Sequence, residues 1–298
     1  MLIPSVAMLA GTLGTGSPQP GTLNSFTGEV WMNGVHAGPV SAGRTTLEAG
    51  RAIRTGDGTA ELLLTPGTFL RLGNHSELTL EAPGPPEIRV RLRNGEAMVE
   101  VLDWNAPIVL AQNEVTVVIR KPGLYDFDEK RGLMAVYAGE AQVSRNGRQI
   151  VATGGFGVRM RQFHEFQARP NAGSTLYSWS SLRSEQLSSE SAASAQTYPG
   201  GAGGWHGPAW YWNPWSASYT FLSASGAVTG PFGWPYYSPG YTPNYIPSHG
   251  GGDSYLYGPP VVPTPGPART IEPGRNSATP SVPLTAPGVP QFPNNRFD

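Results

Sequence analysis

The segment Arg54–Leu80 restricts the possible folds of this chain more than any other part of the sequence. It contains three short apolar runs, Ala60–Leu64, Thr68–Leu72 and Leu78–Leu80, separated by Thr65-Pro66-Gly67 and Gly73-Asn74-His75-Ser76. Each run is too short for a stable helix, and the separating residues favour tight turns. The pattern predicts β-strands joined by turns, and no side chain in it indicates a reacting group.

The same pattern of short strand-like runs separated by turn residues continues from Phe26 to about Met160. Asn-Gly is a strong hairpin signal because a type I′ turn needs positive φ at both central residues. Three such dipeptides occur: Asn33-Gly34, Asn94-Gly95 and Asn146-Gly147. In Glu87–Arg93, apolar residues alternate with arginines, which predicts a half-buried strand. We expect the chain to turn at Asn94-Gly95 and return as a strand over Ala97–Leu102, with Glu96 and Glu100 opposite the arginines.

Seven further strands are predicted before Met160. They are Ile108–Leu110, Val115–Arg120, Gly123–Phe127, Leu133–Tyr137, Ala141–Arg145, Gln149–Ala152 and Gly157–Met160. No helical period of adequate length appears in this region. A succession of so many short strands predicts an all-β domain, and a sandwich, a barrel and a short solenoid remain open.

Several of these strands carry a family resemblance. GEVWMNG is followed by LEAGRAIRTGDGTAELLLTPGTFLRLGNHSELTLE, by VRLRNGEAMVEV, and later by VTVVIRKPGLYDFD and LMAVYAGEAQVSRNG. This order of glycine-punctuated strands resembles the FecR domain family and covers residues 25–160. The resemblance implies a stack of short, mainly antiparallel strands, sandwich-like or solenoid-like, and it says little about a ligand.

Regulatory FecR proteins have a cytoplasmic helical segment that binds a sigma factor, one transmembrane helix and a periplasmic FecR domain. This sequence shows neither the helical segment nor the spanning helix. With its aromatic C-terminal extension, the chain resembles secreted FecR-domain proteins of bacteria, a group that offers no activity to carry over. The expectation is therefore an extracytoplasmic β-domain over residues 25–165, without the signalling apparatus.

One helix is predicted over residues 172–197. Leu176, Trp179, Leu182 and Leu187 recur near one face, and the opposite face consists of Ser, Glu and Arg. Ser174 or Thr175 is suited to cap the N-terminus. We expect this amphipathic helix to dock on the β-domain, and binding of a partner is the alternative.

Residues 198–247 form a Gly-rich, Trp-rich and Tyr-rich extension, expected to be irregular. No charged residue occurs between Glu190 and Asp253, whereas aromatic residues crowd together. Internal capping of the β-domain, self-association or binding of a protein, and binding of a glycan are the three interpretations. The candidate binding or self-association residues are Trp205, Trp210, Tyr211, Trp212, Trp215, Tyr219, Phe232, Trp234, Tyr236 and Tyr237.

Composition argues against several kinds of site. The chain has no cysteine, which excludes disulfides and thiolate ligands, and its 20 basic and 21 acidic residues argue against nucleic-acid binding. His164 and Glu165 are adjacent, so a strand would place them on opposite sides. Asp126, Asp128 and Glu129 are expected to be solvated carboxylates near a turn, with a weak calcium site as the alternative. We predict no catalytic residue, no cofactor and no metal.

The first residues of the chain predict export, and the last ones differ in composition from the rest. Residues 1–24 begin MLIPSVAMLAG, an apolar run that is typical of an export signal although it lacks a basic start, and it is too short to span a membrane. Residues 248–298 are Pro-rich and are expected to be mobile. The prediction is a non-catalytic exported binding or structural module at the cell envelope or outside the cell. A self-assembling subunit and a glycan-binding or glycan-active protein are the alternatives.

Overall fold

The computed structural model of the chain describes residues 17–171, 173–200 and 202–241. All of them belong to the first of two compact units into which the chain divides, residues 1–259. The export segment up to residue 16, the last residues of the aromatic extension and the Pro-rich tail, 248–298, lie outside the described residues.

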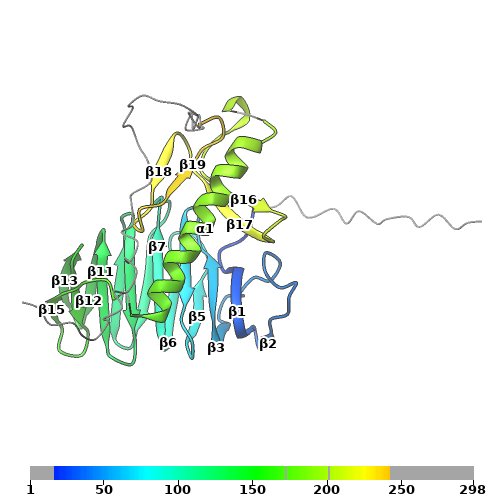
Figure 1. The fold of residues 1–298 in the computed structure, drawn as a ribbon. Helices are drawn as coiled ribbons and strands as arrows, with labels where there is room; N and C mark the ends of the chain where they lie inside the picture. Colours follow the sequence, from blue (N-terminus) through cyan, green and yellow to red (C-terminus); the bar gives the residue numbers. More distant parts are fainter. Residues whose placement is uncertain (1–16, 172, 201, 242–298) are drawn as a thin grey trace, which may run out of the picture. The chain divides into compact units, whose positions relative to one another are not determined.

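Fifteen strands form one sheet (Figure 1). They are β1 (Thr22–Met32), β2 (Val35–His36), β3 (Ala52–Leu63), β4 (Thr68–Leu72), β5 (Glu77–Ala82), β6 (Ile88–Asn94), β7 (Glu96–Val101), β8 (Ile108–Gln112), β9 (Val115–Ile119), β10 (Gly123–Asp128), β11 (Leu133–Ala138), β12 (Glu140–Arg145), β13 (Arg148–Thr153), β14 (Phe156–Arg159) and β15 (His164–Gln167). The prediction of an all-β fold of mainly antiparallel strands is confirmed. Among the described strand pairs, β6 and β8 form the single parallel one.

The sheet folds back on itself at its longest strand, β3. Its first residues, Ala52–Arg54, pair with β5, whereas Ala60–Leu63 pair with β4, and β1 pairs with both parts. The strand order is therefore β13-β12-β9-β8-β6-β5-β3-β4-β7-β10-β11-β14-β15. The two arms face each other, and their ends meet where Arg145 Nη1 donates to the carbonyl oxygens of Met160 and Arg161, at 3.0 and 2.6 Å. A folded, sandwich-like sheet results.

The main core lies between the two arms. It consists of buried aliphatic and aromatic side chains from both arms, among them Leu78, Val90 and Val117 on one side and Tyr125 and Val136 on the other. Alternation along the strands explains this arrangement, since every second side chain points to the same face of a sheet.

Two of the three predicted Asn-Gly hairpins are present. Asn33 and Gly34 have φ of 54° and 84° and join β1 to β2, while Asn146 and Gly147, at 48° and 77°, join β12 to β13. These are the positive angles that a type I′ turn requires. The turns fix the register of both hairpins.

The third hairpin prediction is wrong. β6 pairs with β5 and β8, whereas β7 pairs with β4 and β10, so the chain crosses from one arm to the other at Asn94-Gly95. Only Gly95 of the pair has positive φ, 83°, and its Cα packs against Ser76. The expected pairing of Glu96 and Glu100 with the arginines of β6 is therefore absent. Those arginines lie beside other partners: Arg89 by Glu87, Arg91 by Glu81 and Arg93 by Thr79.

A second layer covers one face of the sheet. It consists of α1 (Thr175–Thr197), a short 3₁₀ turn (Ala202–Gly204) and two hairpins, β16 (Ala209–Asn213) with β17 (Ser218–Leu222) and β18 (Ala227–Thr229) with β19 (Pro235–Tyr237). Figure 1 shows α1 crossing the sheet near β7, with the hairpins beside its C-terminal half. The expectation of an irregular extension is wrong for residues 209–237, because their aromatic side chains pair across the two hairpins and pack on the sheet.

The helix is present, and its predicted N-cap is confirmed, since Ser174 Oγ accepts a hydrogen bond from the Tyr177 amide at 3.3 Å. Its predicted apolar face is wrong in part. Leu176 and Leu187 are buried, but Leu182 is 66% exposed, and Arg183 with several serines is buried instead. Small serine side chains allow the helix to approach the sheet closely. Ser184 bonds to Glu100 of β7, and Ser188 and Ser191 bond to β19, whereas the buried Ser180 hydroxyl has no hydrogen-bond partner among the described residues. No helix among the described residues is long and apolar enough to cross a membrane.

Candidate functional site

A buried charge cluster connects the sheet to the second layer. Glu61 on β3 and Arg71 on β4 are cross-strand neighbours, and Arg71 Nε donates to Glu61 Oε2 at 2.8 Å. Arg71 Nη1 donates to Glu100 Oε2 on β7 at 2.7 Å, and all three side chains are fully buried. An arginine between two carboxylates satisfies charges that would otherwise be very unfavourable away from water.

The helix contributes to the same cluster. Arg183 Nε donates to Glu61 Oε1 at 3.0 Å, and Ser184 Oγ donates to Glu100 Oε1 at 2.8 Å. Tyr236 of β19 lies with its hydroxyl 3.0 Å from Ser184 Oγ and donates to the Ser184 carbonyl at 3.0 Å. The sheet, the helix and the second hairpin therefore share one hydrogen-bond network.

The first hairpin is connected at two further points. Asn24 Nδ2 donates to Glu61 and to the Tyr219 carbonyl, and Asn24 Oδ1 accepts from the Tyr219 amide at 2.7 Å. Ser218 Oγ donates to Glu190 of the helix at 3.1 Å. Both contacts hold the end of the hairpin at which β16 turns into β17.

The pKa shifts in the cluster follow from burial and charge. Burial alone would raise the pKa of Glu61, but the charges of Arg183 and Arg71 outweigh it and hold the pKa below its ordinary value. Burial raises the pKa of Glu100 in spite of the attraction of Arg71. Burial would lower the pKa of Arg71, but Glu100 and Glu61 raise it. Arg71 is therefore charged at every accessible pH.

The ten predicted binding residues fall into three groups by exposure. Trp210 and Tyr236 are buried with Phe221 in a cluster that also contains Phe69 of β4. Trp215 is exposed. The remaining seven are half-buried: Trp205, Tyr211, Trp212, Tyr219, Phe232, Trp234 and Tyr237. Part of the aromatic block therefore caps the sheet, in agreement with the capping interpretation.

Six of the seven half-buried rings pack against another aromatic ring. Trp212 and Tyr219 meet edge to face with centroids 4.9 Å apart, and the Trp212 ring lies directly on Gly43, where no side chain would fit. Trp205 and Tyr211 both contact Tyr198 at the end of the helix, at 5.2 and 6.0 Å. Edge-to-face pairs of this kind stabilise a rigid surface.

Trp215 differs from all of them. It lies in the turn between β16 and β17 and is 96% exposed. The turn is nevertheless ordered, because the Trp215 amide donates to Asn213 Oδ1 at 3.0 Å, and the Ser216 and Ser218 hydroxyls are 3.0 Å apart. The hairpin thus presents an exposed indole ring from an ordered turn.

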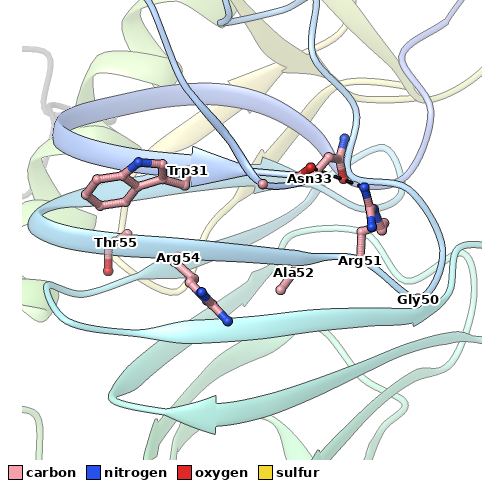
Figure 2. Close-up of a pocket in the computed structure, with 8 residues that line it drawn as sticks. Trp31, Asn33, Gly50, Arg51, Ala52, Arg54 and Thr55 are labelled. Atoms are coloured by element: carbon pink, nitrogen blue, oxygen red, sulfur yellow. Dashed lines mark hydrogen bonds between the residues drawn. The ribbon is translucent and has the colours of Figure 1, made fainter.

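A groove of about 600 Å³ lies elsewhere, on β1 and β3. Figure 2 shows the Trp31 ring at one end and Arg51 with Asn33 at the other, with Ala52 and Arg54 between them. Trp31 and Arg54 are cross-strand neighbours, and Arg54 Nε lies 3.0 Å from Glu77 Oε2. None of the groove residues is among those that the sequence predicts, because a lone tryptophan in a strand is usually a packing residue.

The acidic residues of β10 are not a solvated cluster, so that expectation is wrong. Asp126 Oδ2 accepts from the Tyr137 hydroxyl at 2.8 Å, and Asp128 is buried with Oδ1 accepting from the Arg131 amide at 2.8 Å. Glu129 accepts from Asn113. Asp126, Asp128 and Glu96 line a cavity of about 280 Å³. Burial, with Glu96 and Asp128 nearby, raises the pKa of Asp126 to about 6.

We expect Asp126→Asn to stabilise the protein at pH 7.5 but not at pH 4. Because the folded pKa is raised from 3.8 to about 6, the folded protein holds this proton more tightly, and stability falls as pH rises through that window. The difference corresponds to at most about 3 kcal/mol, and solvent access lowers the expected gain to about 1–2 kcal/mol. Urea unfolding at both pH values measures it. Glu165→Gln, an exposed change on β15, is the control, and an equal effect of Asp126→Asn at both pH values would contradict the assignment.

No group of three or more histidine, aspartate or glutamate side chains in residues 17–171, 173–200 and 202–241 is arranged to hold a metal ion. His164 and Glu165 are exposed on β15.

None of the predictions from the sequence includes the buried cluster of Glu61, Arg71, Glu100 and Arg183. A signal for it exists, because AELLL, TFLRL and AMVEV each contain a single charged residue in an apolar run. Single charges inside runs that are otherwise apolar indicate buried ion pairs when the runs are strands of one sheet.

Comparisons with known proteins add little. No protein-family model matches the sequence, and no curated protein matches it. Two crystal structures of a "putative anti-sigma factor" from Parabacteroides distasonis, at 2.50 and 1.65 Å resolution, align with TM-scores of 0.34 and 0.35 and with 14% and 13% identity. They cover 46% and 45% of this chain, and this chain spans 64% of each of them.

Proposed function

We propose that this protein is a non-catalytic, exported binding module with a FecR-like β-domain, which acts at the cell envelope or outside the cell. One observation carries the proposal: an almost fully exposed tryptophan, Trp215, lies in an ordered turn. The base of this turn bonds to Glu190 of the helix and to Asn24, which donates to Glu61 of the buried charge cluster. Because the backbone of the turn is already ordered, only the side-chain torsions of Trp215 lose freedom on binding, which favours affinity.

The second layer supports this role. Glu61, Arg71 and Arg183 connect it to the sheet, so the hairpin that bears Trp215 is a fixed part of the domain. Aromatic rings with an ordered backbone are typical of interface residues that dominate binding energy. The apolar run MLIPSVAMLAG supports export, and a chain without cysteine is compatible with an oxidising compartment. Location can be tested by N-terminal sequencing of the protein recovered from periplasmic and culture fractions, and recovery from the cytoplasm alone would contradict export.

We expect Trp215→Ala to weaken binding to isolated cell-envelope material at least tenfold without lowering the melting temperature, because the ring makes almost no contact within the protein. Co-sedimentation with envelope fractions and thermal unfolding measure the two effects. Trp104→Ala is the matched control, since Trp104 is also a surface tryptophan, 38% exposed, in the loop after β7. Unchanged binding by Trp215→Ala would contradict the proposal.

Self-assembly is the second candidate, and the same exposed ring favours it. A chain that ends near Pro199 is unsuitable for testing it, because removing β16–β19 would uncover Phe69 and the charge cluster. Light scattering on the full chain and on Trp215→Ala separates the candidates. Oligomers that dissociate in the variant would favour self-assembly, and a monomeric parent protein would exclude it.

A further inference from the structure

A third cavity, of about 330 Å³, lies beside the Trp215 turn. β1 contributes Ser25 and Phe26, the helix contributes Arg183 and Gln186, and the turn contributes Ser216 and Ser218. This volume lies at the lower end of the range for small-molecule sites, about 300–1,000 Å³, so one small ligand group would fill it.

Arg183 is the unusual residue of this cavity. Its side chain is only 6% exposed, and Nε is used by Glu61 at 3.0 Å. Among the described residues, its buried Nη2 atom has no hydrogen-bond partner, and the Nη2 atom of Arg71 has none either, but only Arg183 lines the cavity. Buried guanidinium N–H groups are almost always satisfied, and an unsatisfied one indicates an acceptor that the protein itself does not supply. The guanidinium is therefore suited to an acceptor oxygen of a ligand.

The charge balance indicates which kind of oxygen that is. Glu61 already neutralises Arg183, and the second arginine of the cluster, Arg71, is held between Glu61 and Glu100. Glu190 lies close by and accepts from Gln186 and Ser218. The cavity has no positive charge in surplus for a phosphate or a carboxylate. A neutral acceptor, such as a hydroxyl or an acetal oxygen, fits better.

The remaining lining matches a sugar. The Ser25 hydroxyl both donates and accepts, as does the Gln186 amide, and Phe26 provides one apolar surface. Ser218 donates its proton to Glu190 and accepts from Ser216, so these two hydroxyls offer a ligand acceptor lone pairs. Sugars combine hydroxyl groups that donate and accept with apolar C–H faces. A pocket for a peptide side chain would need either more apolar lining or a charged partner. Trp215 directly precedes Ser216 of the cavity lining, and its ring is 96% exposed.

We propose that the cavity between β1, α1 and the β16–β17 turn binds one unit of a neutral glycan, and that Trp215 stacks on the next unit. This inference rests on the proposed binding function and specifies its ligand class. Arg183 and Gln186 bind the oxygen atoms of the unit in the cavity. Ser216 and Ser218 position it, and Trp215, which belongs to the same turn, binds the neighbouring unit.

A glycan array with neutral and acidic members tests the proposal on the full chain, followed by calorimetric titration with the best neutral member. We expect binding of a neutral glycan, a loss of at least tenfold for Gln186→Leu and a similar loss for Trp215→Ala. Gln186 is exposed, so its replacement should leave the melting temperature unchanged. Gln149→Leu, the same change at an exposed site on β13, is the control and should bind like the parent.

The inference can fail while the binding function stands. Binding of acidic glycans alone, binding of no glycan, or undiminished neutral-glycan binding by Gln186→Leu would each overturn the glycan site. If Trp215→Ala still abolished binding to envelope material in those cases, the ligand would be of another class, such as a protein. If both variants bound envelope material like the parent protein, the proposed function would fail as well.

Discussion

Replacing Arg71 by methionine should destabilise the protein by about 3–5 kcal/mol, one of the two largest effects that we expect from a single substitution. Methionine keeps most of the length of the side chain but leaves Glu61 and Glu100 buried without their shared cation. Arg183 still reaches Glu61, but Glu100 then keeps only the hydroxyl of Ser184. Urea unfolding followed by circular dichroism measures the loss.

Two further variants identify the cause of that loss. Arg71→Met combined with Glu100→Gln should be more stable than Arg71→Met alone, because the buried charge has been removed. Arg54→Met, which removes an exposed ion pair with Glu77, should change stability by less than about 1 kcal/mol. If the double variant were no more stable than Arg71→Met, lost packing rather than an unpaired charge would be the cause.

The strands were predictable because their signals are local. Alternating side chains and turn residues mark β4 and β8–β14, and Asn-Gly marks two hairpins. The pairing of strands is not a local property, and this explains the error at Asn94-Gly95. The same dipeptide that closes a hairpin elsewhere carries the chain between the two arms here, since β6 and β7 each pair with strands distant in sequence.

The candidate site was predictable only in part, for a related reason. The sequence points to the aromatic residues but does not show which rings are buried, because that depends on what they cover. Trp210 packs on Phe69 of β4, whereas Trp215, five residues later, lies in a turn. The serines of α1 look like a solvent-facing surface in the sequence. Five of them are buried instead, and the sheet and the hairpins supply partners to some of these, such as Glu100 for Ser184 and the Pro235 carbonyl for Ser188.

Truncating Phe221 to alanine should show that the aromatic extension and the β-domain unfold together. Phe221 is fully buried, with its ring centroid 6.2 Å from Trp210 and 6.1 Å from Tyr236, in the cluster that includes Leu63 of β3 and Phe69 of β4. The resulting cavity should lower stability by about 3–5 kcal/mol. For a domain of this size the melting temperature should fall by about 6–20 °C.

Whether the two spectroscopic signals of unfolding shift together is as informative as the midpoint of the unfolding transition. Tryptophan fluorescence reports largely on the extension, which carries Trp205, Trp210, Trp212, Trp215 and Trp234, whereas far-ultraviolet circular dichroism is dominated by the fifteen-stranded sheet. Because Arg183 and Ser184 connect the layers through Glu61 and Glu100, both signals should shift together in Phe221→Ala. Tyr241→Ala, at a ring that is 48% exposed, should shift neither. A fluorescence transition that moved alone would mean that the extension unfolds independently of the sheet, and the Trp215 turn would then lack the fixed support on which its proposed binding role depends.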